Sequence, residues 1–114
     1  MSIPALSSQL RSLFKIGVFD SGVGGLTVLK EMAEQMPHES VIYFGDTARV
    51  PYGNRSKSEI LRFVREIIAW MIDSDVKMII MACNTSSALV LVEVRSEFPI
   101  HILGIILPGA RAAV

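Results

Sequence analysis

Three short segments of the sequence carry residues that could bind or transform a small molecule. They are residues 20–25 (DSGVGG), residues 45–55 (GDTARVPYGNR) and residues 83–87 (CNTSS). Each follows a short apolar run and precedes a stretch with helical periodicity. Chemically active side chains therefore recur at one kind of position, the passage from a strand to a helix.

Cys83 is the sharpest candidate because it follows a buried strand and opens a helix. Backbone amides and the helix dipole stabilise a thiolate at such a position, so this thiol is suited to act as a base or a nucleophile. Asn84, Thr85 and Ser86 add neutral hydrogen-bonding groups, and Thr85 or Ser86 is expected to cap the helix. The alternative is a buried structural cysteine, a frequent fate of this residue type.

The glycine-rich segment after Asp20 and Ser21 lets backbone amides approach an anion at a helix N-terminus. The pattern is no dinucleotide fingerprint, because Thr27 stands where a third glycine would be needed, and it lacks the lysine of a phosphate loop. The alternative interpretation is a tight turn that simply requires glycine.

The long segment after Gly45 offers Asp46, Arg49, Tyr52 and Arg55 as polar groups. Long connections between a strand and a helix are often functional. A solvated surface loop, with Asp46 as its cap, is the alternative.

The periodicity of the chain predicts the elements that position these segments. Ser56 and Glu59 have the spacing of a capping box, which predicts a helix start there, with Ile60, Val64 and Met71 among the residues of its apolar stripe. Pro37 and Pro99 follow two other helical stretches. Expected strands are residues 15–19, 40–44, 77–82 and 102–106, and the other expected helices are residues 26–36 and 86–98.

Strands that alternate with helices predict an α/β fold, here a three-layer domain with a parallel sheet. All strand-to-helix loops of such a sheet lie at one edge, where ligands bind. The three polar segments are therefore expected to meet at that edge.

Composition narrows the class of protein. The 114 residues are 51% apolar, with a mean hydropathy of +0.48, which excludes a disordered chain and suits one small domain. Eleven acidic and eleven basic residues give no net charge, which argues against a nucleic-acid partner. A single cysteine excludes an internal disulfide and a multi-cysteine zinc site, so no metal site is expected and the compartment is expected to be the cytoplasm. No signal peptide or membrane span is expected, and residues 1–14 are interpreted as an N-terminal extension.

The three segments, taken together, resemble the successive motifs of the glutamate racemases. The resemblance rests on DSGVGGL at residues 20–26, YFGDTARVPYG at residues 43–53 and ACNT at residues 82–85, with Gly104 and residues 108–110 resembling the next family segment. Similarity runs from about Ile16 to the end of the chain and identifies residues 15–114 with the N-terminal α/β domain of such an enzyme.

The resemblance implies cofactor-independent interconversion of L- and D-glutamate, which supplies D-glutamate for peptidoglycan and so serves cell-wall biogenesis and cell shape. Cys83 would be one of two catalytic bases. Carried over onto this sequence, the substrate-binding residues would be Asp20, Ser21, Tyr52, Gly53, Asn84 and Thr85. No lysine lies in a cofactor motif, so pyridoxal phosphate is not expected.

The family has a second, similar domain that supplies another cysteine, followed by threonine and histidine, and the sequence to Val114 contains no such motif. We therefore expect this chain to hold half of an active site, to bind free glutamate and to be inactive alone. Two alternatives stay open: a homodimer that faces two Cys83 thiols toward one substrate, or a non-catalytic binding or regulatory module.

Overall fold

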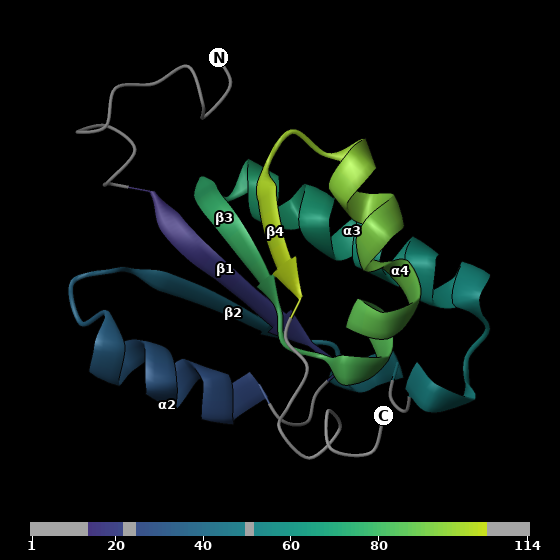
Figure 1. Cartoon of the computed structure of the whole chain (residues 1–114), viewed down its shortest axis with the longest axis horizontal. Helices are drawn as coiled ribbons and strands as arrows, with labels where there is room; N and C mark the ends of the chain where they lie inside the picture. The colour runs from purple at the N-terminus through teal and green to yellow at the C-terminus, as the bar shows by residue number, and fades with distance from the viewer. Residues whose placement is uncertain (1–13, 22–24, 50–51, 105–114) are drawn as a thin grey trace.

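A computed structural model of the chain describes residues 14–21, 25–49 and 52–104. Within these residues, four strands alternate along the chain with three longer helices, and Figure 1 shows their arrangement. The elements are β1 (Lys15–Asp20), α2 (Gly25–Gln35), β2 (Val41–Gly45), the short 3₁₀ turns η2 (Thr47–Arg49) and η3 (Tyr52–Asn54), α3 (Lys57–Asp73), β3 (Val76–Met81), α4 (Asn84–Glu97) and β4 (His101–Gly104). Each expected strand and helix is present within the described residues, with bounds shifted by at most two residues. The last part of the expected strand 102–106, residues 105 and 106, and the family segment at residues 108–110 lie outside the described residues.

The sheet is parallel throughout, in the order β2-β1-β3-β4. Its register pairs Asp20 with Gly45 and Phe19 with Met81, so the first three strands end side by side. Parallel strands need helical crossovers, and these account for the alternation seen in the sequence. The predicted α/β fold with a parallel sheet is confirmed.

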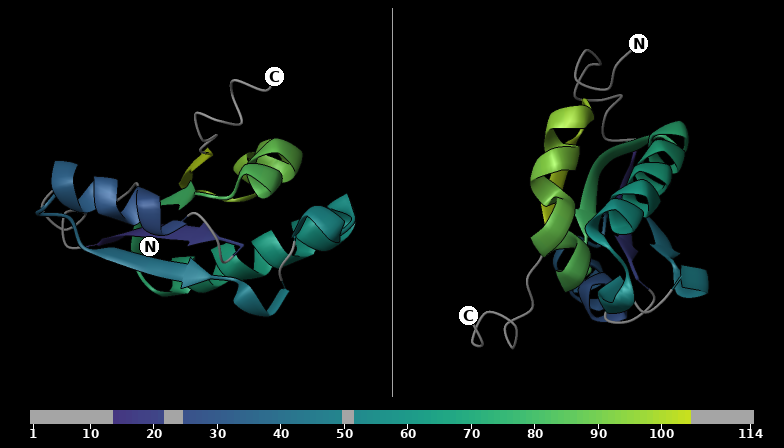
Figure 2. Two further views of the ribbon diagram at one scale, coloured as in Figure 1. Left: turned by 90° about the horizontal axis from the view of Figure 1, so that it is seen from below. Right: turned by 90° about the vertical axis from the view of Figure 1, so that its right-hand side faces the viewer.

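The two faces of the sheet are covered unequally (Figure 2). Helices α3 and α4 pack on one face and build the larger core, to which Phe63, Ile68 and Val94 contribute. Helix α2 packs on the other face through Val28 and Met32. The larger core includes Tyr52 and Cys83, so it anchors the second and third loops of the carboxyl edge.

Helix α3 begins where the sequence predicts. Ser56 accepts a hydrogen bond from the Glu59 amide, and the Glu59 carboxylate accepts one from the Ser56 amide, so the capping box is complete. The predicted stripe is buried and is extended by Phe63, which the periodicity did not single out. This helix is amphipathic along its whole length.

Helix α2 departs from the expected pattern. The sequence suggests an apolar face that includes Leu26, yet Leu26 is 71% exposed. Met32 of the same expected face is buried, together with Gly25 and Val28. Because the helix covers only part of its sheet face, its second apolar flank is left partly in solvent.

Candidate functional site

The predicted meeting of the three polar segments is confirmed by the backbone. Asp46 donates its amide hydrogen to the Asp20 carbonyl over 3.0 Å, and Ala82 donates to the Phe19 carbonyl over 2.8 Å. These bonds continue the sheet ladder one step past the strands. They hold the starts of the three loops beside one another at the carboxyl edge.

Asp20, the first expected substrate-binding residue, has a buried carboxylate, with 0% of the residue exposed. Tyr43 donates its hydroxyl hydrogen to Asp20 Oδ1 over 2.9 Å. Burial, with the hydrogen bond and the charge of Asp20, raises the pKa of the Tyr43 phenol to about 12. The phenol is thus held neutral and remains a donor to the carboxylate.

Gly25 makes room for this pair at the start of α2. A Cβ atom built on Gly25 would lie 2.0 Å from Asp20 Oδ2 and 2.8 Å from Tyr43 Cε2. The carboxylate therefore lies directly against the first turn of α2, where the helix dipole favours negative charge. Close packing therefore requires glycine at this position. Ser21, which follows Asp20 in the chain, is buried as well.

The polar groups of the second loop bind one another. Arg49 Nε donates to both carboxylate oxygens of Asp46, over 3.0 and 2.8 Å, and Tyr52 donates its hydroxyl to Asp46 Oδ2. Arg49 Nη1 donates to Glu66 Oε2 of α3 over 2.8 Å. Burial and the bond to Asp46 raise the pKa of Tyr52. The sequence presented these groups as candidates for a ligand, or as a solvated loop, whereas the structure shows an internal network.

Tyr52 and Gly53 occupy opposite environments although they are neighbours in η3. Tyr52 is 2% exposed, while Gly53 is exposed and has open space where a Cβ would stand. Helix α4 contacts this turn. With the Tyr52 hydroxyl committed to Asp46, η3 presents its backbone, Gly53 and the exposed Asn54 outward.

Cys83 is the residue at the N-cap of α4, with φ −103° and ψ 122°. The expectation of Thr85 or Ser86 at the cap is wrong, because the helix begins at Asn84, directly after the cysteine. The thiol therefore stands at the end of the helix where amide groups point outward. Cys83 is 5% exposed and shares the larger core with Tyr52.

Hydroxyl groups support the first turn of α4 from within. Ser87 donates to the Met81 carbonyl over 3.1 Å, and Ser86 donates to the Cys83 carbonyl over 3.4 Å. Thr85 is half-buried on the same turn. Ser86 and Ser87 are thus structural, which leaves Cys83, Asn84 and Thr85 as the candidates of this loop.

Sequence reasoning missed three partners of the site: Tyr43, Glu66 and Phe63. Tyr43 lies two residues before Gly45, which pairs with Asp20, so the period of two placed both side chains on one face of the sheet. The alternation of side chains along β2 could therefore have identified Tyr43 as a neighbour of Asp20, given the pairing of the two strands. Glu66 and Phe63 could not be assigned, because their contacts depend on how α3 packs beside the loop.

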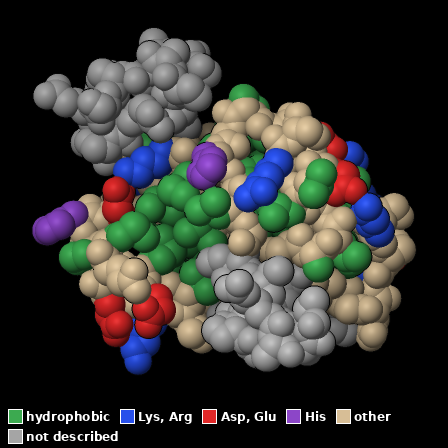
Figure 3. Space-filling model, viewed as in Figure 1, with side chains coloured by type: hydrophobic (Ala, Val, Ile, Leu, Met, Phe, Trp, Pro, Cys, Tyr) green, Lys and Arg blue, Asp and Glu red, His purple; other side chains and the backbone are tan. Residues whose placement is uncertain are grey.

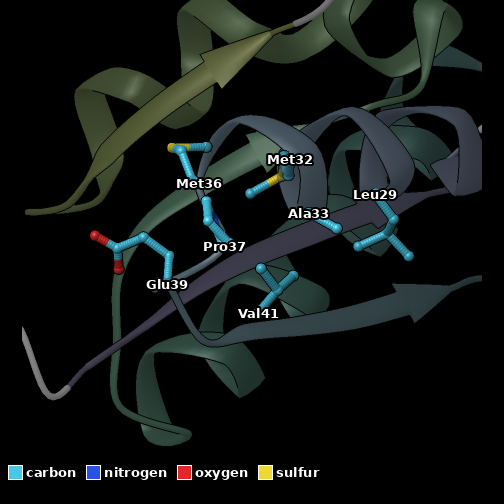
Figure 4. A pocket seen from close by; sticks show the side chains of 7 residues that line it. All are labelled: Leu29, Met32, Ala33, Met36, Pro37, Glu39 and Val41. Atoms are coloured by element: carbon cyan, nitrogen blue, oxygen red, sulfur yellow. The ribbon is translucent and has the colours of Figure 1, made fainter.

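An apolar hollow lies away from these residues, between α2 and β2 (Figure 4). It has a volume of about 410 Å³ and is lined by Leu29, Met32, Ala33, Met36, Pro37, Glu39 and Val41. Hydrophobic side chains gather on this face of the molecule (Figure 3). No expected site residue lines the hollow, and its lining offers a single carboxylate as a polar side chain, so the chemistry belongs to the carboxyl edge.

Neither a metal-binding cluster nor a membrane-spanning helix is present in the described part of the chain. No group of three or more His, Cys, Asp or Glu residues there could hold a metal ion. Among those same residues, no helix has the length and apolar character needed to cross a membrane.

Three known proteins that are similar to this chain are glutamate racemases. No family model matches it. A glutamate racemase of Rippkaea orientalis is 72% identical over 99 residues, which cover 87% of this chain and 35% of that enzyme. A glutamate racemase from Bacillus anthracis superposes with a TM-score of 0.80 at 45% identity, over 90% of this chain and 38% of that one. The Francisella tularensis glutamate racemase, solved in complex with D-glutamate, gives 0.75 at 44% identity, over 80% and 35% of the two chains.

The chain thus spans little more than a third of the length of the relatives it matches, and within that span sequence and fold agree. The sequence identity and the structural similarity therefore point to the same group of proteins. In sequence and in fold, this chain is similar to the N-terminal part of glutamate racemases.

Proposed function

We propose that this chain forms one half of the active site of a glutamate racemase that works without a cofactor. Cys83 is the base on one face of the substrate. Asp20, Ser21, Tyr52, Gly53, Asn84 and Thr85 surround the amino acid. The D-glutamate formed serves peptidoglycan synthesis.

The position of Cys83 is the observation that carries this proposal. Cys83 occupies the N-cap position of α4 at the carboxyl edge, beside the loops that begin at Asp20 and Asp46. Ligands of parallel sheets bind at this edge. The bound D-glutamate of the Francisella tularensis relative supports the choice of substrate.

The chemistry needs two opposed acid–base groups. The Cys83 thiolate takes the α-proton of glutamate and becomes a thiol, which leaves the electron pair on the α-carbon. A second acid on the opposite face then gives a proton to that carbon, and inversion is complete. In the reverse direction the Cys83 thiol is the proton donor. Hydrogen bonds from the loops to the substrate carboxylate stabilise the charge that develops.

One cysteine provides one of these two groups, so the 114-residue chain is expected to be inactive alone. The purified chain should leave L-glutamate optically unchanged, as followed by circular dichroism of the amino acid. Turnover by a monomeric chain would contradict the half-site proposal. Turnover by a dimer that disappears in Cys83→Ala would favour two facing copies of the chain instead.

A chimaera provides the positive test. This chain replaces the matching segment of the Rippkaea orientalis enzyme, which is 72% identical to it. The chimaera should racemise glutamate and introduce solvent deuterium at the α-carbon, and Cys83→Ala should abolish both. A folded chimaera that binds glutamate without racemising it would favour a binding module.

A further inference from the structure

The network around Arg49 has no part in the proton transfers described above, yet it joins the second loop to α3. We infer that Arg49 is a positioning residue: by bridging Asp46 and Glu66 it fixes the η3 turn beside Cys83. The inference rests on the proposed function for its catalytic meaning, while its structural content is tested separately below.

Arg49 is held from three sides. Its Nε donates to both oxygens of Asp46, its Nη1 donates to Glu66 over 2.8 Å, and its guanidinium carbon lies 4.0 Å from the centre of the Phe63 ring. A planar guanidinium satisfies all three contacts at once, whereas a lysine ammonium lacks the flat group. One side chain therefore joins η2 to two successive turns of α3.

Asp46 passes this constraint to Tyr52. The carboxylate is buried, its backbone amide is tied to the Asp20 carbonyl, and it accepts the Tyr52 hydroxyl. Because the Tyr52 ring is buried, moving the carboxylate would require the whole η3 turn to move. The position of Gly53 at the surface follows from the same constraint.

Tyr52 brings the network to Cys83. Both residues belong to the larger core, and the η3 turn that carries Tyr52 contacts α4, the helix that begins directly after Cys83. Cys83 is only 5% exposed, and we infer that the η3 turn contributes to its cover. Releasing Arg49 should loosen this cover.

A positioning role and a purely electrostatic role predict opposite results. If Arg49 positions the turn, its removal exposes Cys83 and speeds alkylation of the thiol. If Arg49 serves only to cancel the charge of Asp46, its removal leaves an uncompensated carboxylate near Cys83, which disfavours the thiolate and slows alkylation.

The experiment follows alkylation of the intact chain by iodoacetamide, an uncharged reagent, at neutral pH without glutamate. Cys83 is the single cysteine, so the signal has one source. Arg49→Met should react several-fold faster than the unmodified chain, and Arg49→Lys should also react faster, because the charge alone does not hold the turn. Arg55→Met is the matched control, since Arg55 also lies near Phe63, at 5.4 Å, but pairs with Glu59 and should leave the rate unchanged.

Global destabilisation is excluded by Met71→Ala. Met71 is buried near Gly17, toward the opposite end of the strands. The free energy of unfolding of every variant is measured in urea. Met71→Ala shows how much a loss of stability alone speeds alkylation, and the alkylation rate of Arg49→Met must be higher than its own loss of stability would give. An unchanged or slower rate, a rate fully explained by lost stability, or a Lys variant equal to the unmodified chain would each overturn the inference.

Glutamate protection separates this inference from the proposed function. Glutamate should slow alkylation of the unmodified chain, and Arg49→Met should need a several-fold higher concentration for half-protection. Absence of protection in every variant would count against the substrate half-site and leave the alkylation result without glutamate to decide the role of Arg49.

Discussion

Two tyrosine–carboxylate pairs lie at the carboxyl edge, and they are built differently. Tyr43 and Asp20 belong to adjacent strands, whose register places them diagonally on one face of the sheet. Tyr52 and Asp46 belong to one loop, and Arg49 holds them from outside. The first pair is set by the backbone ladder and the second by side chains, so the second should be the easier one to displace.

The two pairs also differ in the groups that surround them. The Tyr43 pair lies against the first turn of α2, where Gly25 leaves space for the carboxylate. The Tyr52 pair is buried in the larger core and has an arginine as its third member. Tight packing maintains the geometry of the first pair, and the hydrogen bonds of Arg49 maintain that of the second.

The largest effect is expected from filling the space beside the first pair. Gly25→Ala places a Cβ 2.0 Å from Asp20 Oδ2, so the carboxylate must leave its place against α2. Overpacking of this kind should destabilise the fold by about 3 kcal/mol, as measured by urea unfolding. Gly53→Ala is the control, because nothing lies within 4 Å of the added atom. Equal losses for the two variants would contradict the packing explanation.

Removing each hydroxyl compares the pairs directly. Tyr52→Phe leaves a buried carboxylate oxygen of Asp46 without its donor, at a cost of about 2 kcal/mol. Tyr43→Phe should cost about 1 kcal/mol, because Tyr43 is only half-buried. Chemical denaturation of both variants gives the two values. A larger loss for Tyr43→Phe would reverse the ranking.

A smaller effect is expected at the capping box, which positions the helix that carries Glu66 and Phe63. Ser56→Ala removes the acceptor of the Glu59 amide and should destabilise the chain by about 1 kcal/mol. The matched variant Ser58→Ala should be nearly neutral, because Ser58 only contacts the Ser56 hydroxyl. Thermal unfolding of the two variants separates cap loss from a general effect of removing serine.

The Tyr43 phenol should affect the pH dependence of the free energy of unfolding only in alkaline solution, because it is neutral at pH 7 in both the folded and the unfolded chain. Folding raises the pKa of Tyr43 from 10.0 to about 12 and therefore favours the neutral phenol. The resulting stabilisation is complete below pH 10.0 and is lost as the pH rises through about 12. The decline is measured by urea unfolding at a series of alkaline pH values.

The absorbance of tyrosinate identifies the group. The chain has two tyrosines, so Tyr52→Phe leaves Tyr43 as the reporter. Adding Asp20→Asn removes the charge that helps to raise the pKa and should move the titration of Tyr43 down toward 10.0. An unchanged titration would mean that Asp20 has no part in the shift.

Much of the fold could be predicted from local signals. The four strands, the helix starting after Ser56 and the shared edge of the three loops follow from apolar periodicity and from the geometry of parallel sheets. The α2 face was misjudged at Leu26, because helical periodicity alone does not show which flank meets the sheet.

The site was predictable in its location more than in its contacts. Cys83, Asp20 and Tyr52 could be named because motif and position coincide at strand ends. Their partners could not: Arg49 reaches Glu66 only because α3 packs beside the loop, 17 residues further along the chain. Side-chain contacts over such separations have no periodic signal in the sequence.

By itself the sequence determined the order of elements, the placing of a lone thiol at a helix start and the glutamate racemase motifs, because periodicity and residue type are local properties. Tertiary structure alone decided that the polar groups of the second loop bind one another and that the Tyr52 hydroxyl is committed to Asp46. The physical reason is burial: once η3 packs against α4, Asp46 and Tyr52 must find partners inside the protein, and the nearest are each other and Arg49.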